Sequence, residues 1–405
     1  MKSMKFNKNN RSGAILPIMM CIILLMMLIG LSVTSLGFYS RLLPIKTASK
    51  ITARCAADSG INEAVFEMNE KLKVTPWDKS DLPAGSEILQ QGTDASFDYI
   101  VSECNGIYAV RSTGHAGNNS THIVYSTLRL GSPFDYALLA RKNIEFKNTA
   151  KLDWVNNQSN DWLPRIGTCS TDSSTVTFMN GSYINGDVMV GVNGDPDEVI
   201  TTKTGVTITG GAYSHTLEPD LPVVGVPAYV AGTSSQGKIN TSRTISTSGK
   251  YDELNLGMGA VLTIDKPVEL YITGNVILGT NSKIVITGSS ESENDASLTM
   301  YVGGDISAGN SMGIVNDTKD AKRFKLFCLP ACRKAVIKNS GDFYGLIYAP
   351  DTAVTFDNGA NSYGSIIADS FILKNSGTFF YDASLRNCTV FDELVRFTIA
   401  RWSEE

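Results

Sequence analysis

The sequence predicts a mainly β protein with an N-terminal transmembrane α-helix, a small antiparallel sheet and a right-handed parallel β-helix, or β-solenoid. Three observations lead to this fold class. Residues 14–40 form an uncharged apolar run, residues 97–130 read as short strands joined by a tight turn, and short tyrosine- and glycine-containing units recur between residues 183 and 368.

A basic leader at residues 1–13 precedes a predicted transmembrane helix at residues 14–40. The leader carries four cations and no acid: Lys2, Lys5, Lys8 and Arg11. The 27 uncharged residues exceed the roughly 20 that span a bilayer as a helix. A cleaved secretory signal is the alternative, because the small residues at 33–35 offer a processing site. The apolar core of such a signal normally has only about 7–15 residues, which is shorter than this run. We therefore expect a single-pass anchor in the bacterial inner membrane, with the N-terminus cytoplasmic and the rest periplasmic.

The helical pattern continues through residues 41–75. Four apolar residues at spacings of four, three and four form one stripe: Ile61, Val65, Met68 and Leu72. This stripe could pack on the protein's own sheet or on other subunits. The two kinds of packing can also occur at different positions along the same helix. Pro44 is expected to kink or interrupt the helix near the membrane surface.

The leader, Gly13, the apolar helix and the segment Ala-Ala-Asp-Ser-Gly-Ile-Asn-Glu-Ala at 56–64 resemble the N-terminal domain of the PilX-type minor pilins. That family belongs to type IV pilus and type II secretion machinery. The resemblance implies cleavage by a prepilin peptidase between Gly13 and Ala14. It also implies inner-membrane lipid and other pilin or pseudopilin subunits as partners. Ile18 stands where major pilins carry a glutamate as their fifth mature residue, which favours a minor subunit.

About 330 residues follow the helix, more than one compact core usually holds, so an elongated or two-part architecture is favoured. The formal net charge is −5, and no basic cluster follows the leader, which argues against nucleic-acid binding. Residues 95–132 are predicted to form the small antiparallel sheet, with a hairpin turn at Asn105-Gly106 because both residues tolerate positive φ.

A β-helix is predicted over residues 135–385. One pattern beginning with tyrosine starts at Tyr183, Tyr271 and Tyr301, and a second pair starts at Tyr344 and Tyr363. Short strands, glycine and asparagine corners and a period near 20 residues indicate a solenoid.

An irregular sandwich of short strands is the alternative. Three prolines between 219 and 227 mark an irregular crossing, and residues 386–405 are expected to cap the last coil. The Tyr-Gly units at 344 and 363, the segment Tyr-Asp-Ala-Ser-Leu at 381–385 and the tail at 401–405 also resemble, more faintly, an uncharacterised β-rich domain carried behind PilX-type anchors. This resemblance implies no activity.

The motifs that suggest chemistry are incomplete, so we predict no catalytic, cofactor or metal site. Ser311 lies in a nucleophile-elbow pattern, but no histidine follows it in the chain. The loop at 232–238 resembles a phosphate-binding loop without its Ser or Thr. The acidic turn at 193–198 lacks the spacing of a calcium loop. Asp187 and Asp305 share a repeat position that is Asn275 in another copy, which indicates a structural corner.

Cys328 and Cys332 flank three residues, and their spacing suits a disulfide in an oxidising compartment. Two buried free thiols are the alternative. Sequence alone does not choose among the pairings of the six cysteines that follow the apolar run.

These observations predict a non-enzymatic minor pilin or pseudopilin-like subunit that displays a β-solenoid head. We expect it on the inner membrane or, after assembly, in a pilus at the cell surface. The alternative is a membrane-anchored β-helix that binds or cleaves surface polysaccharide. A third hypothesis is self-polymerisation through coil ends, as in bactofilin-like filaments.

Overall fold

The structure is a computed structural model, and it describes residues 15–73, 77–89, 94–156, 163–288, 296–309, 313–339, 341–357, 360–374, 376–390 and 392–404. The chain divides into two compact units. Unit 1 comprises Met1–Leu130 with Phe397–Glu405, and unit 2 comprises Gly131–Arg396. In chain order, unit 2 is therefore inserted into unit 1 before its last strand.

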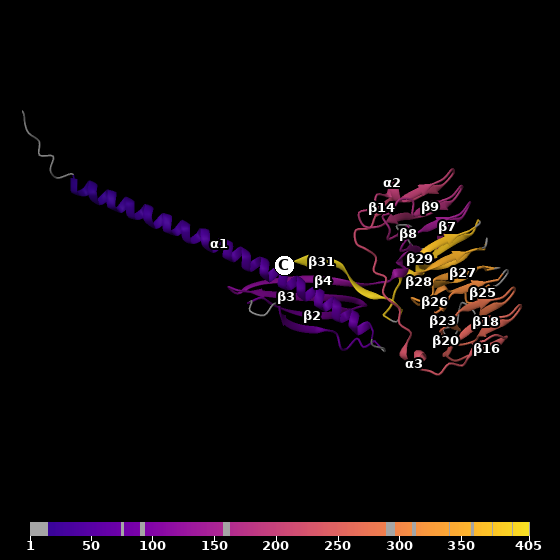
Figure 1. Ribbon diagram of the computed structural model, residues 1–405. Helices are drawn as coiled ribbons and strands as arrows, with labels where there is room; N and C mark the ends of the chain where they lie inside the picture. The colour runs from indigo at the N-terminus through magenta and orange to yellow at the C-terminus, as the bar shows by residue number, and fades with distance from the viewer. Residues whose placement is uncertain are drawn as a thin grey trace, which may run out of the picture. The chain divides into compact units, whose positions relative to one another are not determined.

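Unit 1 consists of one long helix and a five-stranded sheet with the strand order β1-β2-β3-β4-β31. Strands β1 to β4 pair antiparallel with their neighbours, and the N-terminal half of α1 extends past the sheet (Figure 1). The elements of unit 1 are α1 Ile15–Leu72, β1 Ala84–Ile88, β2 Ser96–Cys104, β3 Ile107–Ala116, β4 Ser120–Gly131 and β31 Arg396–Glu404.

The helix α1 runs without interruption through Pro44, so the expectation that this residue interrupts the helix is wrong. Proline removes one backbone N–H donor and crowds the preceding turn. The hydrogen bonds of the turns on both sides are sufficient to keep the 58-residue helix continuous, because each added turn reinforces a helix that is already nucleated.

The hairpin predicted at Asn105-Gly106 is present. Both turn residues have positive φ, 53° and 81°, and they join β2 to β3 with the register Cys104↔Ile107. Two strands of this sheet, β1 and β31, were not predicted.

Unit 2 contains short strands that pair in parallel with strands one winding away. Its first part contains β5 Leu138–Ala140, β6 Ile144–Phe146, β7 Lys151–Val155, β8 Arg165–Thr168, β9 Val176–Phe178, β10 Tyr183–Ile184, β11 Asp187–Val190, β12 Ile200–Thr202, β13 Thr207–Ile208 and β14 Ala212–Ser214. Strands β5, β6 and β7 pair with β8, β9 and β10, which pair in turn with β11, β12 and β13.

The second part of unit 2 follows the same rule. Its strands are β15 Lys238–Ile239, β16 Arg243–Ile245, β17 Gly249–Tyr251, β18 Glu253–Leu256, β19 Val261–Ile264, β20 Pro267–Ile272, β21 Val276–Leu278, β22 Lys283–Ile286, β23 Ser297–Val302, β24 Ile306–Ala308, β25 Gly313–Asn316, β26 Phe324–Cys328, β27 Lys334–Ile337, β28 Phe343–Phe356, β29 Ser362–Leu373 and β30 Thr378–Asp382. The short helices are α2 Pro196–Val199 and α3 Ala228–Ala231, and the 3₁₀ turns are η1 Pro133–Asp135, η2 Ala321–Arg323 and η3 Ala383–Arg386.

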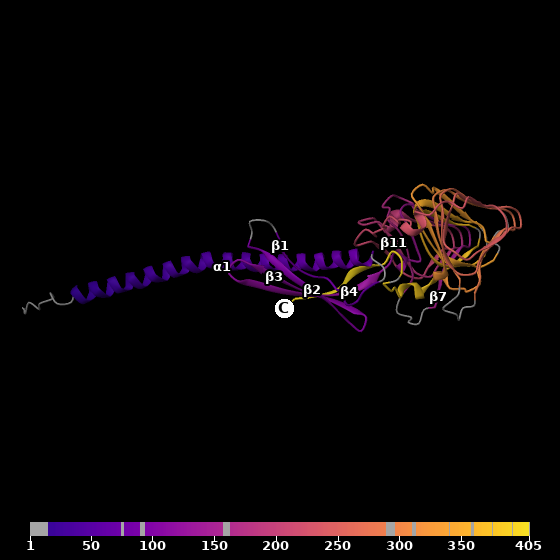
Figure 2. The same cartoon turned by 90° about the horizontal axis from the view of Figure 1, so that it is seen from below.

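The first and last windings of unit 2 are neighbours in space. Strand β29 pairs with both β5 and β6, and β30 pairs with β7. The chain therefore winds away from β5 as far as β14, crosses through residues 215–237, and winds back from β15 to β30. The predicted proline-containing crossing is this connection, and Figure 2 shows the windings of unit 2 overlapping when viewed along the stack.

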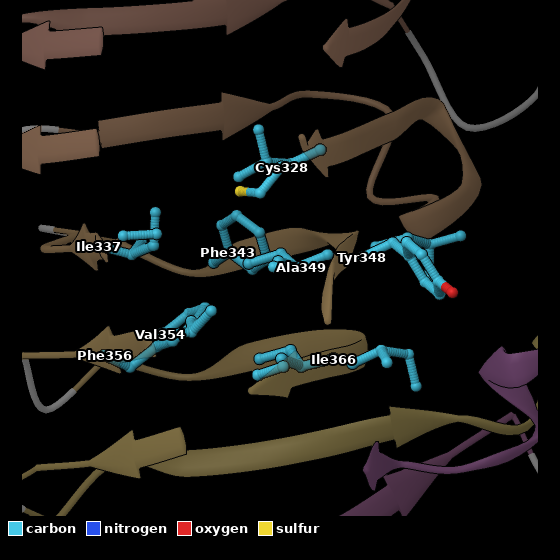
Figure 3. Packing of buried hydrophobic residues seen from close by; sticks show 14 of the residues in the cluster. Cys328, Ile337, Phe343, Tyr348, Ala349, Val354, Phe356 and Ile366 are labelled. Atoms are coloured by element: carbon cyan, nitrogen blue, oxygen red, sulfur yellow. The ribbon is translucent and has the colours of Figure 1, made fainter. Parts of the chain in front are cut away.

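The core of unit 2 is one continuous apolar cluster. Inward side chains alternate with outward ones along strands such as β18, where Leu254 and Leu256 are buried, so stacking the windings gives columns of buried residues. Figure 3 shows part of this core, with Phe343, Val354 and Phe356 of β28 near Ile337 of β27 and Ile366 of β29.

The predicted solenoid repeats lie on strands that stack in register. Tyr271 of β20 faces Tyr301 of β23, and Tyr344 of β28 faces Tyr363 of β29. The parallel pairing between repeat strands that a solenoid requires is thus present.

The shared Asp/Asn position of the repeats is a structural corner in all three copies. Oδ1 of Asp187 accepts the Gly211 N–H at 2.9 Å, and Oδ1 of Asn275 accepts the Asp305 N–H at 2.9 Å. Oδ1 of Asp305 accepts the Arg333 N–H at 2.8 Å. Aspartate and asparagine interchange here because each supplies the side-chain oxygen that holds the next winding.

The predicted C-terminal cap differs from the structure. Residues Arg396–Glu404 form β31 beside β4, in the sheet of unit 1. Phe397 is buried there, with its ring 4.9 Å from that of Tyr108 and 5.8 Å from that of Trp77. Burying this aromatic cluster and pairing the β4 edge favour the sheet position.

Candidate functional site: the N-terminal helix

The first part of α1 is long and apolar enough to cross a membrane. Its most apolar 18-residue window has a mean hydropathy of 2.7, and no residue of that window is buried within the chain. Large apolar side chains stay exposed along this segment, for example Leu16 at 75 % and Leu36 at 75 %. A surface of this kind marks a contact with lipid or with other protein chains.

The second part of α1 lies on the sheet of unit 1 through small side chains. Ala53, Ala56, Ala57 and Ala64 are fully buried against it, together with Ile61 and Met68. Of the predicted apolar stripe, Ile61 and Met68 are thus fully buried, whereas Val65 and Leu72 are only partly buried.

Two glycines set the distance between α1 and the sheet. A Cβ on Gly114 of β3 would lie 1.9 Å from the Ala53 carbonyl oxygen, and a Cβ on Gly60 of α1 would lie 2.2 Å from Ser112 Oγ. These separations leave no room for a side chain, so the helix backbone approaches the strand directly.

The last strand is fastened to α1 at both of its ends. The Asn69 side chain accepts the Phe397 N–H at 2.7 Å and donates to the Phe397 carbonyl at 3.2 Å. At the other end, the Arg54 guanidinium forms an ion pair with Glu404, whose carboxylate also lies 3.4 Å from His122 Nε2.

Charge is distributed unevenly along α1. Residues 41–54 contain four cations and no acid, Arg41, Lys46, Lys50 and Arg54. The next charged residues are the acids Asp58, Glu63, Glu67 and Glu70. Burial raises the pKa of Asp58 above its ordinary value, and this effect outweighs the opposing attraction of Arg54.

The predicted processing residues Gly13 and Ala14 lie outside the described residues, as does the rest of the leader. Ile18, the predicted fifth residue of the mature chain, is 57 % exposed on α1. Cleavage therefore stays a prediction.

Cys328 and Cys332 are both buried and are free thiols in the structure. A hydrogen bond to Cys332, with desolvation, raises the pKa of the Cys328 thiol well above its ordinary value. The Thr352 hydroxyl also donates to the Cys332 carbonyl at 2.8 Å. The two sulfur atoms are thus neighbours, and the predicted disulfide stays a prediction.

Unit 2 contains a polar cavity of about 510 Å³ lined by Arg141, Cys169, Glu218, Pro219, Asp220 and Leu221. Arg141 is already paired with Asp351 at 2.5 Å, and Asp220 with Arg396. Burial raises the pKa of Cys169 to about 11, which disfavours the thiolate that a nucleophile requires. The cavity therefore offers no activated nucleophile.

Of the remaining sequence motifs, the acidic turn at 193–198 forms a helix cap. Ser311 lies outside the described residues. Asp195 caps the four-residue helix α2 by accepting the Asp197 N–H. Among the residues that the structure describes, no three His, Cys, Asp or Glu side chains lie together as a metal site would require.

This chain shows limited similarity to known proteins. A family described as "Domain of unknown function (DUF7305)" matches residues 225–388. No curated protein matches the chain.

Two solved structures resemble the chain weakly. The competence-associated pilin ComZ from Thermus thermophilus aligns over 88 % of this chain and 97 % of its own, with 11 % identity and a TM-score of 0.21. The DUF3494 domain of an ice-binding protein from Shewanella frigidimarina aligns over 61 % and 92 %, with 16 % identity and a TM-score of 0.27.

Proposed function

We propose that this chain is a non-enzymatic minor pilin or pseudopilin-like subunit. Its anchor holds it in the inner membrane, with the N-terminus cytoplasmic, before it joins a filament tip or an initiation complex. The observation that supports this proposal most is the division of α1 into two parts. One part is of membrane length and is exposed, and the other lies on the sheet of its own chain.

A helix divided in this way can serve two states of one subunit. In the membrane, lipid covers the exposed part; in an assembly, the corresponding helices of other subunits would cover it. The close packing at Gly60 and Gly114 keeps the second part rigid, so movement of the helix carries the sheet with it. The resemblance of residues 10–75 to PilX-type minor pilins adds the expectation of prepilin peptidase processing at Gly13.

We infer further that the windings of unit 2 form a right-handed β-helix head. Their parallel registers and the shared apolar core support this inference. The head would supply bulk or surface contact to the assembly.

Copurification tests the proposal. The tagged full-length chain, extracted from membranes in mild detergent, should bring down pilin-type subunits of the same cell. A variant in which Leu24 and Leu28 are both replaced by lysine should reduce this capture at least tenfold, because lysine is poorly tolerated at an apolar helix contact. Replacing exposed Lys203 and Lys283 of unit 2 by glutamate is the control. Capture that does not depend on the α1 changes would contradict the proposal.

A polysaccharide-binding or polysaccharide-cleaving β-helix is the second candidate. One observation favours it: Tyr344, Tyr363 and Phe380 form a ladder of partly exposed stacked rings, 4.4 and 4.8 Å apart. Aromatic rings of this kind can contact sugars. Incubating the full-length chain in detergent with a broad panel of envelope polysaccharides tests it, and the absence of both binding and cleavage would exclude it.

A further inference from the structure

The stack of windings in unit 2 has two ends, and the chain covers one of them well. This end consists of β15, β16 and β17, and the inward side chains of Ile239, Ile245 and Tyr251 are buried there although they belong to the outermost winding. The Arg243 guanidinium lies 5.4 Å from the centre of the Tyr251 ring and donates to its hydroxyl at 3.2 Å. That hydroxyl in turn donates to the Gln236 side-chain oxygen at 3.0 Å. This end is therefore closed.

The opposite end, which consists of β12, β13 and β14, is open; it lies near the labels α2 and β14 in Figure 1. These strands pair on one side with β9, β10 and β11, and no strand in the described part of unit 2 pairs with their other edges. Ile200 and Ile208 pack against the core but are only partly buried, and Ala212 is exposed. Their partners one winding away are fully buried. Unpaired strand edges above apolar side chains require a cover, as the terminal repeats of solenoid proteins do.

The two segments that flank β12 at this open end have opposite charges. Asp197 and Glu198 of α2 precede the strand, and Lys203 follows it. All three side chains are exposed, and none of them forms an ion pair with another described residue. The strand itself, Ile200–Thr202, is uncharged. The open edge of β12 therefore has a negative end and a positive end.

We propose that the open end of unit 2 binds the same end of a second copy of this chain. In this arrangement β12 of one copy pairs antiparallel with β12 of the other, about a two-fold axis near Thr201. Antiparallel pairing brings the segment before the strand in one copy against the segment after it in the other. Lys203 of each copy thus lies beside Asp197 and Glu198 of the other, so the contact is complementary in charge.

The same two-fold axis suits the other two strands. It places β13 of each copy over β14 of the other, with the small Ala212 opposite the larger Ile208. A strand from a different protein is the other conceivable occupant, but it would pair with one edge and leave two edges open. The closed end offers no equivalent surface, so the association stops at two copies. This inference uses unit 2 alone and does not depend on the pilin role.

Two differently tagged full-length copies, produced together and extracted in mild detergent at low salt, test the contact. The unaltered copies should copurify. Ala212→Lys in both copies should lower copurification about tenfold, because the contact would bury an unpaired charge that the single chain leaves in solvent. Ala353→Lys, at an exposed alanine of β28 between β27 and β29, is the matched control and should stay within about twofold of the unaltered chain.

Charge reversal tests the two-fold arrangement. Lys203→Glu in both copies should lower copurification about fivefold, because it sets a like charge against Asp197 and Glu198. Asp197→Lys with Glu198→Lys in both copies should do the same. One copy of each variant together restores attraction at both corners and should recover to within about twofold of the unaltered chain. This recovery also shows that both variants fold.

Three results would overturn the inference. They are unaltered copies that do not copurify, as a strand from a different protein at the open end would give, copurification that Ala212→Lys leaves unchanged, and a mixed pair that does not recover. Lys203→Glu leaves α1 unaltered and should not change the capture of pilin-type subunits. Failure of this inference and failure of the proposed function are therefore separate results.

Discussion

The side chain of Asn69 pairs with the backbone of Phe397 as a neighbouring strand would, by accepting its N–H at 2.7 Å and donating to its carbonyl at 3.2 Å. Some 328 positions separate the two residues in the chain. The last strand is therefore fastened to the first helix only after all of unit 2 has been made.

We expect Asn69→Ala to loosen β31. The change removes both hydrogen bonds and leaves backbone groups of Phe397 unpaired, which should destabilise the strand by about 1–3 kcal/mol. Amide hydrogen exchange of residues 396–404 measures this directly. Asn62→Ala, at an exposed position of the same helix, is the matched control and should leave the exchange unchanged. Equal exchange in the two variants would show that Asn69 does not fasten the strand.

Gly114→Ala should separate α1 from the sheet. Its new Cβ would lie 1.9 Å from the Ala53 carbonyl oxygen and 2.4 Å from the Ala57 nitrogen, and both are backbone atoms that cannot rotate away. We expect a loss of at least 1–3 kcal/mol in the unfolding of unit 1, as for other overpacked cores. Gly257→Ala, where no atom lies within 4 Å, is the control. Thermal unfolding that is the same for both variants would contradict the packing described for Gly114.

Asp305→Asn should leave unit 2 stable, whereas Asp305→Ala should lower its stability by about 1–2 kcal/mol. The Asp305 side chain accepts the N–H groups of Arg333 and Lys334 at 2.8 and 3.0 Å, and an amide oxygen can do the same. Thermal unfolding compares the two variants. Equal destabilisation by both would mean that the negative charge, and not the acceptor, is what the corner requires. That result would reopen a chemical role for the repeat aspartates.

Asp58 should destabilise unit 1 increasingly as the pH rises. Its pKa is raised in the folded chain by burial, so the folded state binds its proton more tightly than the unfolded state does. Below the ordinary Asp value of 3.8 both states are protonated and no penalty exists. The penalty develops as the pH rises from 3.8 through the raised value and is complete above it.

Comparing the melting temperatures of Asp58→Asn and the unaltered chain tests this pH dependence. Asp58→Asn should melt higher at pH 7, and the difference should shrink as the pH falls towards 3.8. A variant that melts lower at pH 7 would show that the attraction of Arg54 outweighs the burial of Asp58.

Much of the fold could be predicted from local sequence. The apolar run at residues 14–40, the Asn105-Gly106 turn and the tyrosine repeats each contain a periodicity or a turn preference that acts over a few residues. These signals led to the helix, the hairpin and the parallel pairing of unit 2.

The long-range features could not be predicted in the same way. Nothing local to residues 396–404 indicates that their partners are β4 and Asn69, because the strand pattern suits any open edge. The pairing of β29 and β30 with β5 to β7 is a similar case, since each winding needs only a neighbour of matching shape. Continuity of the helix at Pro44 likewise depends on the long helical segments that lie on both sides of this residue.

The N-terminus of the membrane-extracted chain gives the most direct test of the central claim, that α1 is the assembly helix of a pilin-type subunit. Full-length protein would be purified from the membrane of its own host and sequenced from its amino end. We expect the mature chain to begin at Ala14, after removal of residues 1–13. A chain that begins at Met1, or at Leu36 as a cleaved secretory signal would leave it, would contradict prepilin-type processing and with it the proposed role.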